Sequence, residues 1–258
     1  MSKLAAFDQL LLQYQSLNYH QDPVLAQRLH DVQAWMKARI AATHQEFFAQ
    51  PENQLMAQYF LNRLYGGPDF DAMAQQIERL LKYAHKAESL LPDNAIKTGT
   101  KSVSLAVLAT RLDEQVAVQL LQDYPADTVL TDEIMRQTLI KLDQGEDRYE
   151  QLHLLDELGV ALDKYMRSTM MYAAFKMCKG IANKYQFERM YDFIQEGFAA
   201  MMTAKARQLG MPSTTFVNAS GLPDTRQITT ARDMSTLAVA LLRDFPREYH
   251  LFATRSFN

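Results

Sequence analysis

Residues 69–84 read DFDAMAQQIERLLKYA, and this stretch decides the fold class. Apolar side chains recur in it at spacings of three and four residues: Phe70, Met73, Ala74, Ile77, Leu80, Leu81 and Ala84. Such a pattern places one continuous apolar stripe along an α-helix. The polar and charged side chains lie off the stripe: Gln76, Glu78, Arg79 and Lys82. We therefore predict an amphipathic helix over 69–84 whose stripe faces a protein core.

The same periodicity continues on both sides of this stretch. Further helices are predicted from Leu4 to Tyr14, from Asp22 to Pro51, from Leu55 to Leu64, from Ile96 to Leu121, from Thr131, from Gly145 to Met166, and from Tyr185 to Met201. Gly99 is expected to kink or weaken the helix from Ile96 to Leu121. Trp35 is expected to be buried on the apolar stripe of the helix that begins at Asp22. The first 198 residues contain no convincing alternating strand pattern. The fold class is therefore all-α, an irregular multi-helix bundle of roughly eight helices.

The pattern changes after Met201. Turn-forming residues gather between Gly210 and Thr230, and a short helix from Thr230 to Asp244 follows, with Thr230 and Asp233 as a capping pair. Its apolar positions are Met234, Leu237, Ala238, Leu241 and Leu242. This helix-loop-helix appendage is too small to bury a core by itself. We predict two parts, a helical domain over 1–201 and an incomplete fragment over 202–258.

Composition limits the function classes. Hydrophobic residues make up 48% of the 258 residues, enough for a core, and the net charge of −3 gives no overall electrostatic case for nucleic acid. No apolar run approaches the roughly 18 residues that would span a bilayer, so we predict no membrane span. Cys178 is the single cysteine and cannot form an internal disulfide, and the acidic Asp8 stands where a signal peptide would be apolar. These features predict a cytoplasmic protein.

Residues 59–70, YFLNRLYGGPDF, resemble the FFLEE-motif (FFLEELY-type) proteins of bacteria. The likeness continues at residues 90–93, at Leu112-Asp113 and at residues 193–198, so it covers about residues 1–200. The resemblance implies a helical protein with no assigned function. The Glu-Glu pair that names those proteins is replaced by Asn62-Arg63 here. Any chemistry of those carboxylates would therefore be missing from this chain.

A second resemblance covers residues 202–258. The stretches TAKARQLGM (203–211), TFVNASGLP (215–223) and TTARDM (229–234) resemble D-alanyl-D-alanine carboxypeptidases, which are penicillin-binding proteins. The resemblance implies that this segment corresponds to the stretch between the Ser-x-Asn and Lys-Thr-Gly motifs of those enzymes. That stretch is scaffold beside their active site and carries none of the catalytic groups. The change of family near Met201 is compatible with a natural fusion, a frameshifted or recombined gene, or an engineered chimera. Sequence alone leaves these origins open.

The chain lacks the nucleophile of those enzymes. Acyl transfer there requires a serine with a lysine one helical turn later, which accepts the hydroxyl proton. No Ser-x-x-Lys occurs in the sequence, and the nearest stretch, Thr98 to Lys101, has threonine in the serine's place. Ser16-Leu17-Asn18 and Lys97-Thr98-Gly99 match the other two motifs by letter only. The first lies near the end of the first predicted helix. The second lies in a predicted helix and precedes the carboxypeptidase-like segment instead of following it. We therefore predict that this chain is not an active serine carboxypeptidase.

Other chemical motifs are incomplete. Glu150-x-x-His153 has the spacing of a di-iron ligand pair, but such sites require that motif twice, and here it occurs once. We predict no catalytic, cofactor-binding or metal-binding residues and no cofactor. The lysines and tyrosines between 172 and 191 are interrupted by Glu188, so no nucleic-acid partner is predicted either.

The interpretation that follows is a non-enzymatic helical interaction or scaffolding protein with an inactive carboxypeptidase-like tail and an unidentified protein partner. One alternative is a metal- or small-molecule-dependent helical-bundle enzyme, which would use Glu150 and His153 together with acids such as Asp69, Asp113 or Asp156. A second alternative is a degenerate relative of the penicillin-binding proteins in cell-wall metabolism.

Overall fold

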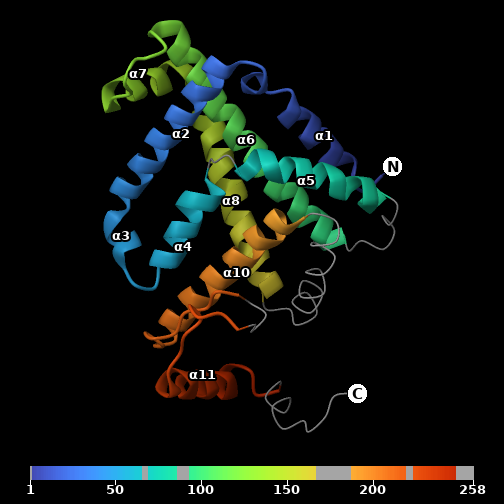
Figure 1. Cartoon of the computed structure of the whole chain (residues 1–258), viewed down its shortest axis with the longest axis vertical. Helices are drawn as coiled ribbons and strands as arrows, with labels where there is room; N and C mark the ends of the chain where they lie inside the picture. The colour runs from blue at the N-terminus through green and yellow to red at the C-terminus, as the bar shows by residue number, and fades with distance from the viewer. Residues whose placement is uncertain (1, 66–68, 86–92, 167–186, 219–222, 248–258) are drawn as a thin grey trace. The chain divides into compact units, whose positions relative to one another are not determined.

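The computed structural model describes residues 2–65, 69–85, 93–166, 187–218 and 223–247 (Figure 1). These residues are helices joined by turns, and their one β-type pairing is an isolated bridge between Thr215 and Ile228. The predicted all-α fold class is confirmed. The chain divides into two compact units, the first made of residues 1–42 and 63–190 and the second of residues 43–62 and 191–258.

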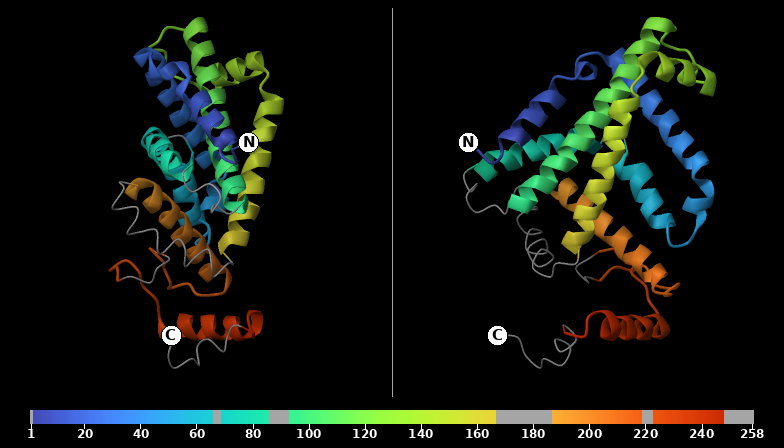
Figure 2. Two further views of the ribbon diagram at one scale, coloured as in Figure 1. Left: turned by 90° about the vertical axis from the view of Figure 1, so that its right-hand side faces the viewer. Right: turned by 180° about the vertical axis from the view of Figure 1, so that it is seen from behind.

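The first unit is built around one long helix. Its helices are α1 (Ala5–Gln15), the 3-10 helix Asn18–His20, α2 (Pro23–Thr43), α5 (Asp69–Ala84), α6 (Asp93–Asp123), α7 (Asp132–Leu142) and α8 (Gly145–Met166). Helix α6 packs against α1, α7 and α8, and Figure 2 shows α8 running beside it. Because three helices share it as a neighbour, α6 is the central element of this unit.

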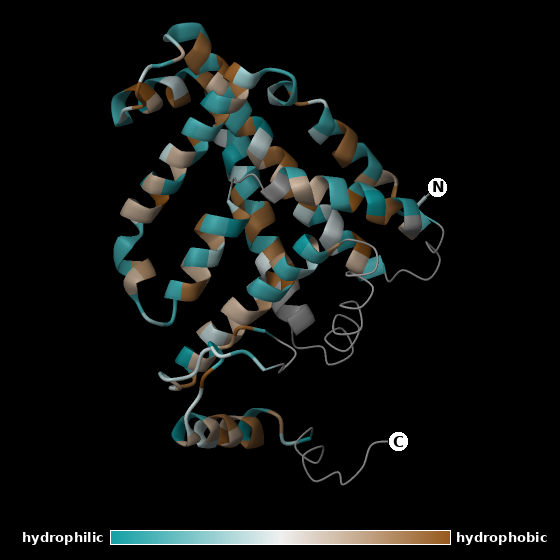
Figure 3. Ribbon diagram, in the orientation of Figure 1, coloured by the Kyte–Doolittle hydropathy of each residue, from teal (hydrophilic) through white to brown (hydrophobic). Residues whose placement is uncertain are grey.

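Two apolar clusters fill the first unit, and α6 contributes to both. The first cluster joins α1, α5 and the N-terminal half of α6: Leu4, Leu11, Tyr14, Leu17, Ala74, Leu81, Val103 and Val107. The second joins α2, α7 and the C-terminal half of α6: Leu25, Leu29, Val32, Val116, Ala117, Leu120 and Met135. Colouring by hydropathy shows brown and teal residues alternating within the turns of these helices, as expected for amphipathic packing (Figure 3).

The second unit contains α3 (Gln45–Ala49), α4 (Gln54–Tyr59), most of α10 (Glu188–Gln208) and α11 (Ala231–Asp244). A π-helical turn, Phe60–Leu64, follows α4 directly. The Tyr59 hydroxyl donates a hydrogen bond to the Phe193 carbonyl at 3.0 Å. Gly197 permits this contact, because a Cβ added there would lie 2.8 Å from the Tyr59 hydroxyl oxygen.

Most predicted helices are present, with corrections at their ends. Asp22 caps α2 as predicted, since its carboxylate accepts the backbone N–H groups of Val24 and Leu25. The helix ends at Thr43 instead of Pro51, and the short α3 follows. The expected burial of Trp35 is only partly met, because this side chain packs at the edge of the second cluster and remains partly exposed.

Gly99 does not interrupt its helix. Helix α6 is continuous from Asp93 to Asp123, and the Phe7 ring lies so close that a Cβ on Gly99 would come within 2.8 Å of it. The glycine therefore serves a close packing contact between α1 and α6 and does not end either half of the helix.

The predicted stripe of α5 is buried at Met73, Ala74 and Leu81, with two departures. Gln76, predicted to lie off the stripe, is buried, whereas Leu80 is 37% exposed. The Gln76 side-chain oxygen accepts the backbone N–H of Met190 at 3.0 Å. Burial of this amide is therefore compensated by a hydrogen bond, which an apolar pattern in the sequence does not indicate.

Helix α10 runs through the predicted boundary at Met201 and ends at Gln208. Among the described residues, no helix is long and apolar enough to cross a membrane. Cys178 and the lysines and tyrosines between 172 and 186 lie outside the described residues, as does the predicted helix start at Tyr185.

Candidate functional site

A buried carboxylate lies in the middle of the first unit. Asp113 of α6 is 1% exposed and is flanked in its helix by the fully buried Leu112 and Val116. An ionised carboxylate at such a depth requires a countercharge or several hydrogen-bond donors. The candidate site consists of the groups that meet this requirement.

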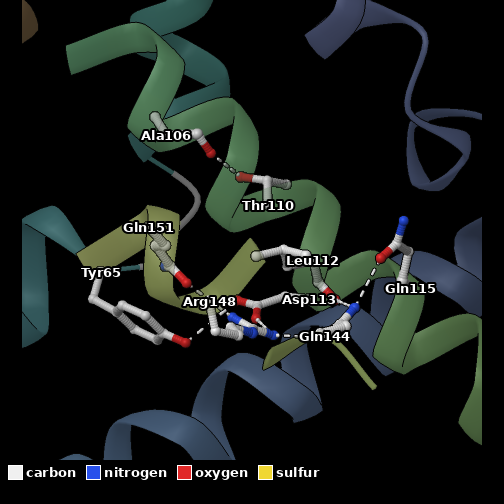
Figure 4. A network of polar contacts seen from close by, with 9 residues as sticks. All are labelled: Tyr65, Ala106, Thr110, Leu112, Asp113, Gln115, Gln144, Arg148 and Gln151. Atoms are coloured by element: carbon white, nitrogen blue, oxygen red, sulfur yellow. Dashed lines mark hydrogen bonds and ion pairs between the residues drawn. The ribbon is translucent and has the colours of Figure 1, made fainter. Parts of the chain in front are cut away.

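Helix α8 supplies the countercharge. The Arg148 guanidinium donates to one Asp113 carboxylate oxygen at 2.9 Å, and the Tyr65 hydroxyl faces the other oxygen at 3.4 Å (Figure 4). Gln144 completes the network from the start of α8. Its amide nitrogen donates to the Leu112 carbonyl at 3.1 Å, and its amide oxygen accepts from Arg148 at 3.3 Å.

Two opposing effects act on Asp113. Burial raises the pKa of its carboxyl, while the neighbouring Arg148 cation lowers it, and burial prevails. Burial also raises the pKa of the Tyr65 phenol, which therefore remains a protonated donor at neutral pH. The network of donors and acceptors fastens α6 to α8.

A second polar cluster joins α1 to α5. The hydroxyls of Tyr14 and Tyr19 both donate to one carboxylate oxygen of Asp71, the second at 2.8 Å. Burial and this hydrogen bonding raise the pKa of both phenols. Asp71 itself is exposed, so the arrangement positions a surface carboxylate by two protonated tyrosines.

A third network organises the second unit. The Asp233 carboxylate, 1% exposed, accepts the Ser213 backbone N–H at 2.9 Å and the Thr214 hydroxyl at 2.7 Å. Arg207 of α10 donates to the carbonyls of Met211 and Thr214. Only half of the predicted capping pair of α11 forms. The Asp233 backbone N–H donates to the Thr230 hydroxyl, but the carboxylate is engaged by the 213–214 turn instead.

The residues considered for a metal enzyme do not converge. Glu150 and Asp156 are exposed on α8, and His153 lies 3.9 Å from Glu157, whose carboxylate accepts from Lys101 at 2.7 Å. Asp113 is committed to Arg148, as described above. The Asp69 side chain lies outside the described residues. Within the described ranges, no group of three His, Cys, Asp or Glu side chains could hold a metal ion.

The letter matches to carboxypeptidase motifs also have other roles. Asn18 donates to the Glu114 carboxylate at 3.2 Å, and Lys97, Thr98 and Gly99 lie within α6. Sequence reasoning missed Arg148 and Gln144. A charged residue within the apolar stripe of α6 signals that a partner exists, but nothing local indicates which helix provides it.

Comparisons with known proteins find one family and, separately, short likenesses to a group of enzymes. The model of a family described as "Domain of unknown function (DUF8198)" matches residues 16–209. A stretch of 63 residues, 24% of the chain, is 41% identical to D-alanyl-D-alanine carboxypeptidase DacC of Escherichia coli (strain K12). D-alanyl-D-alanine carboxypeptidase DacA of Haemophilus influenzae is 33% identical over 60 residues, 23% of the chain. The chain spans only 16% and 15% of the lengths of these two relatives. No solved structure matches.

Proposed function

The chain belongs to this family of unknown function, and we propose that it acts as a non-enzymatic helical interaction or scaffolding protein with an inactive carboxypeptidase-like tail. The finer assignment, an FFLEE-type protein of the bacterial cytoplasm, is part of the same proposal and rests on the residues quoted for that resemblance. The activity of the carboxypeptidases is not transferred, because the match is short and the chain has no Ser-x-x-Lys.

One observation carries the proposal: large apolar side chains on helix α8 are uncovered. Tyr149, Leu152 and Val160 are 74%, 64% and 66% exposed. Single exposed apolar residues are common, but several on one helix face are typical of a surface that another protein covers. The two most deeply buried carboxylates, by contrast, are engaged inside the units, Asp113 by Arg148 and Asp233 by Thr214.

Site-specific photo-crosslinking tests this proposal. A benzophenone amino acid is placed at Leu152 of α8 or at Ile140 of α7, both about two-thirds exposed, and the full chain is irradiated in the cells that produce it. We expect a discrete adduct with another protein from at least one position. The absence of any adduct, together with stoichiometric iron, manganese or zinc in the purified protein, would overturn the proposal in favour of a metal-dependent enzyme.

A further inference from the structure

Helix α8 is apolar on two sides. Its inner side includes the buried Leu158 and packs against α6. Its outer side carries Tyr149, Leu152 and Val160, all more than half exposed. At about 100° per residue these three positions fall within an arc of about 80°, so they form one stripe that spans roughly three helical turns. A helix with a second apolar stripe needs a second neighbour to cover it.

Carboxylates lie on the outer stripe and to one side of it. Glu146, Glu150 and Asp156 are exposed. At about 100° per residue Asp156 falls within the arc, whereas Glu146 and Glu150 lie about 40° and about 80° beyond the same edge of it. None of the three has an ion pair or a side-chain hydrogen bond within the described part of the chain. Asp147, by contrast, faces Arg111 at 3.9 Å. The stripe and its acidic border therefore present a surface with unmatched negative charge.

We infer that this outer face of α8 binds an amphipathic helix of a partner protein, in which lysines or arginines flank an apolar stripe. The inference rests on the proposed function and specifies its surface and partner. Apolar side chains at spacings of three and four would cover Tyr149, Leu152 and Val160, while the cations would pair with the free carboxylates. A second copy of this chain does not fit, because self-pairing would bring the acidic borders together.

The stripe also sets the size of the partner segment. From Tyr149 to Val160 the helix rises about 16 Å at about 1.5 Å per residue, so a partner helix of roughly 12–18 residues would cover it. A matched probe is a fluorescein-labelled 14-residue helical peptide made only of leucine and lysine, with leucine at spacings of three and four. The same peptide with glutamate in place of lysine is the control for charge.

Fluorescence anisotropy with the full chain measures binding of both probes. We expect the lysine peptide to bind at least about tenfold more tightly than the glutamate peptide, with a preference that weakens as salt is added. The double variant Glu150→Lys/Asp156→Lys should weaken binding of the lysine peptide by about tenfold or more. The variant Glu46→Lys/Asp127→Lys changes the net charge equally at exposed positions that do not belong to α8, and it should leave the dissociation constant within about twofold of wild type. Equal losses in both double variants would overturn the inference.

The apolar part of the surface has its own control. Leu152→Ser should weaken binding of the lysine peptide severalfold, whereas Val129→Ser, at an 80% exposed position outside the stripe, should not. Because both side chains are exposed, neither change is expected to unfold the protein, and circular dichroism verifies this. Binding that is insensitive to Leu152→Ser would reduce the interaction to charge alone and contradict a docking surface.

The crosslinker at Leu152 separates this inference from the proposed function. An adduct that is lost in Glu150→Lys/Asp156→Lys and kept in Glu46→Lys/Asp127→Lys supports the inference. A protein captured from Ile140 but not from Leu152 would overturn it while leaving the proposed function intact. An adduct of Leu152 with a second copy of the chain would also overturn it.

Discussion

Replacing Arg148 by methionine would isolate the charge that stabilises Asp113. The two charged groups are 2.9 Å apart, and their side chains are 23% and 2% exposed, respectively. At an effective dielectric constant of about 20, charges at that distance attract by about 6 kcal/mol, which the cost of removing both from water largely offsets. Removing only the arginine keeps the cost for Asp113 and loses the attraction. We expect Arg148→Met to lower the free energy of unfolding by about 3–5 kcal/mol.

The converse substitution should be milder. In Asp113→Asn the unpaired group is the Arg148 guanidinium, which can still reach water, so we expect a loss of about 1–3 kcal/mol. The double variant Asp113→Leu/Arg148→Met removes both charges and should recover most of the loss. The two single variants are expected to differ because the Asp113 side chain is 2% exposed and the Arg148 side chain is 23% exposed.

Lowering the pH should partly rescue Arg148→Met. Burial raises the pKa of the Asp113 carboxyl, and the variant lacks the cation that opposes this shift. A carboxyl whose folded-state pKa lies above its unfolded value binds more protons in the folded state. Its unfavourable effect is therefore fully present above the folded-state pKa, decreases as the pH falls through that pKa, and is gone below the unfolded-state pKa. We expect the stability difference between Arg148→Met and wild type to shrink as the pH is lowered from neutrality.

The assay uses the single tryptophan. Trp35 lies in the same unit as Asp113 and packs against its second apolar cluster, so urea unfolding followed by tryptophan fluorescence reports on that unit. A cost of Asp113→Asn equal to or above that of Arg148→Met would refute the argument from exposure. A pH-independent difference between Arg148→Met and wild type would refute the assignment of the buried charge.

A labelled β-lactam should form no covalent adduct with the full chain, because no Ser-x-x-Lys is present; an acylated serine in the mass spectrum would contradict this. Trp35→Ala should cost about 2–3 kcal/mol in a urea melt followed by circular dichroism, less than a fully buried tryptophan; a loss below about 1 kcal/mol would mean that α2 does not pack through this side chain. Gly197→Ala should destabilise by about 1–3 kcal/mol, because its Cβ would meet the Tyr59 hydroxyl at 2.8 Å. Gly159→Ala, with nothing within 4 Å of its Cβ, should instead stabilise α8 by about 0.5–1 kcal/mol, and equal effects of the two would count against this packing account.

The fold class was predictable because it depends on local periodicity. Asp22 and Thr131 act as helix caps where the sequence indicated helix starts. Periodicity does not report which neighbour covers a face. Gln76 is therefore buried against expectation, and Leu152 is exposed although it belongs to an apolar pattern.

The candidate site was predictable only in part. Asp113 stands within the apolar stripe of α6, so its burial and its need for a partner are readable from the sequence. Its partner, Arg148, is 35 residues away and on another helix, so it is known only once α8 packs on α6. The pairing also explains why Asp113 is not available to join Glu150 and His153, which point to another part of the surface of α8.

The carboxypeptidase-like segment also shows the difference between contacts that are near in sequence and contacts that need a distant surface. Helix α10 is continuous across Met201, so this segment does not begin at a linker. Its interactions that are near in sequence are formed, from Thr203 with Phe216 to Thr214 with Asp233. Three apolar side chains on α11 or directly after it, by contrast, remain about half exposed: Met234, Leu242 and Phe245. Local polar contacts can thus preserve the shape of a short segment, whereas covering an apolar helix face requires a distant surface that the described part of this chain does not supply.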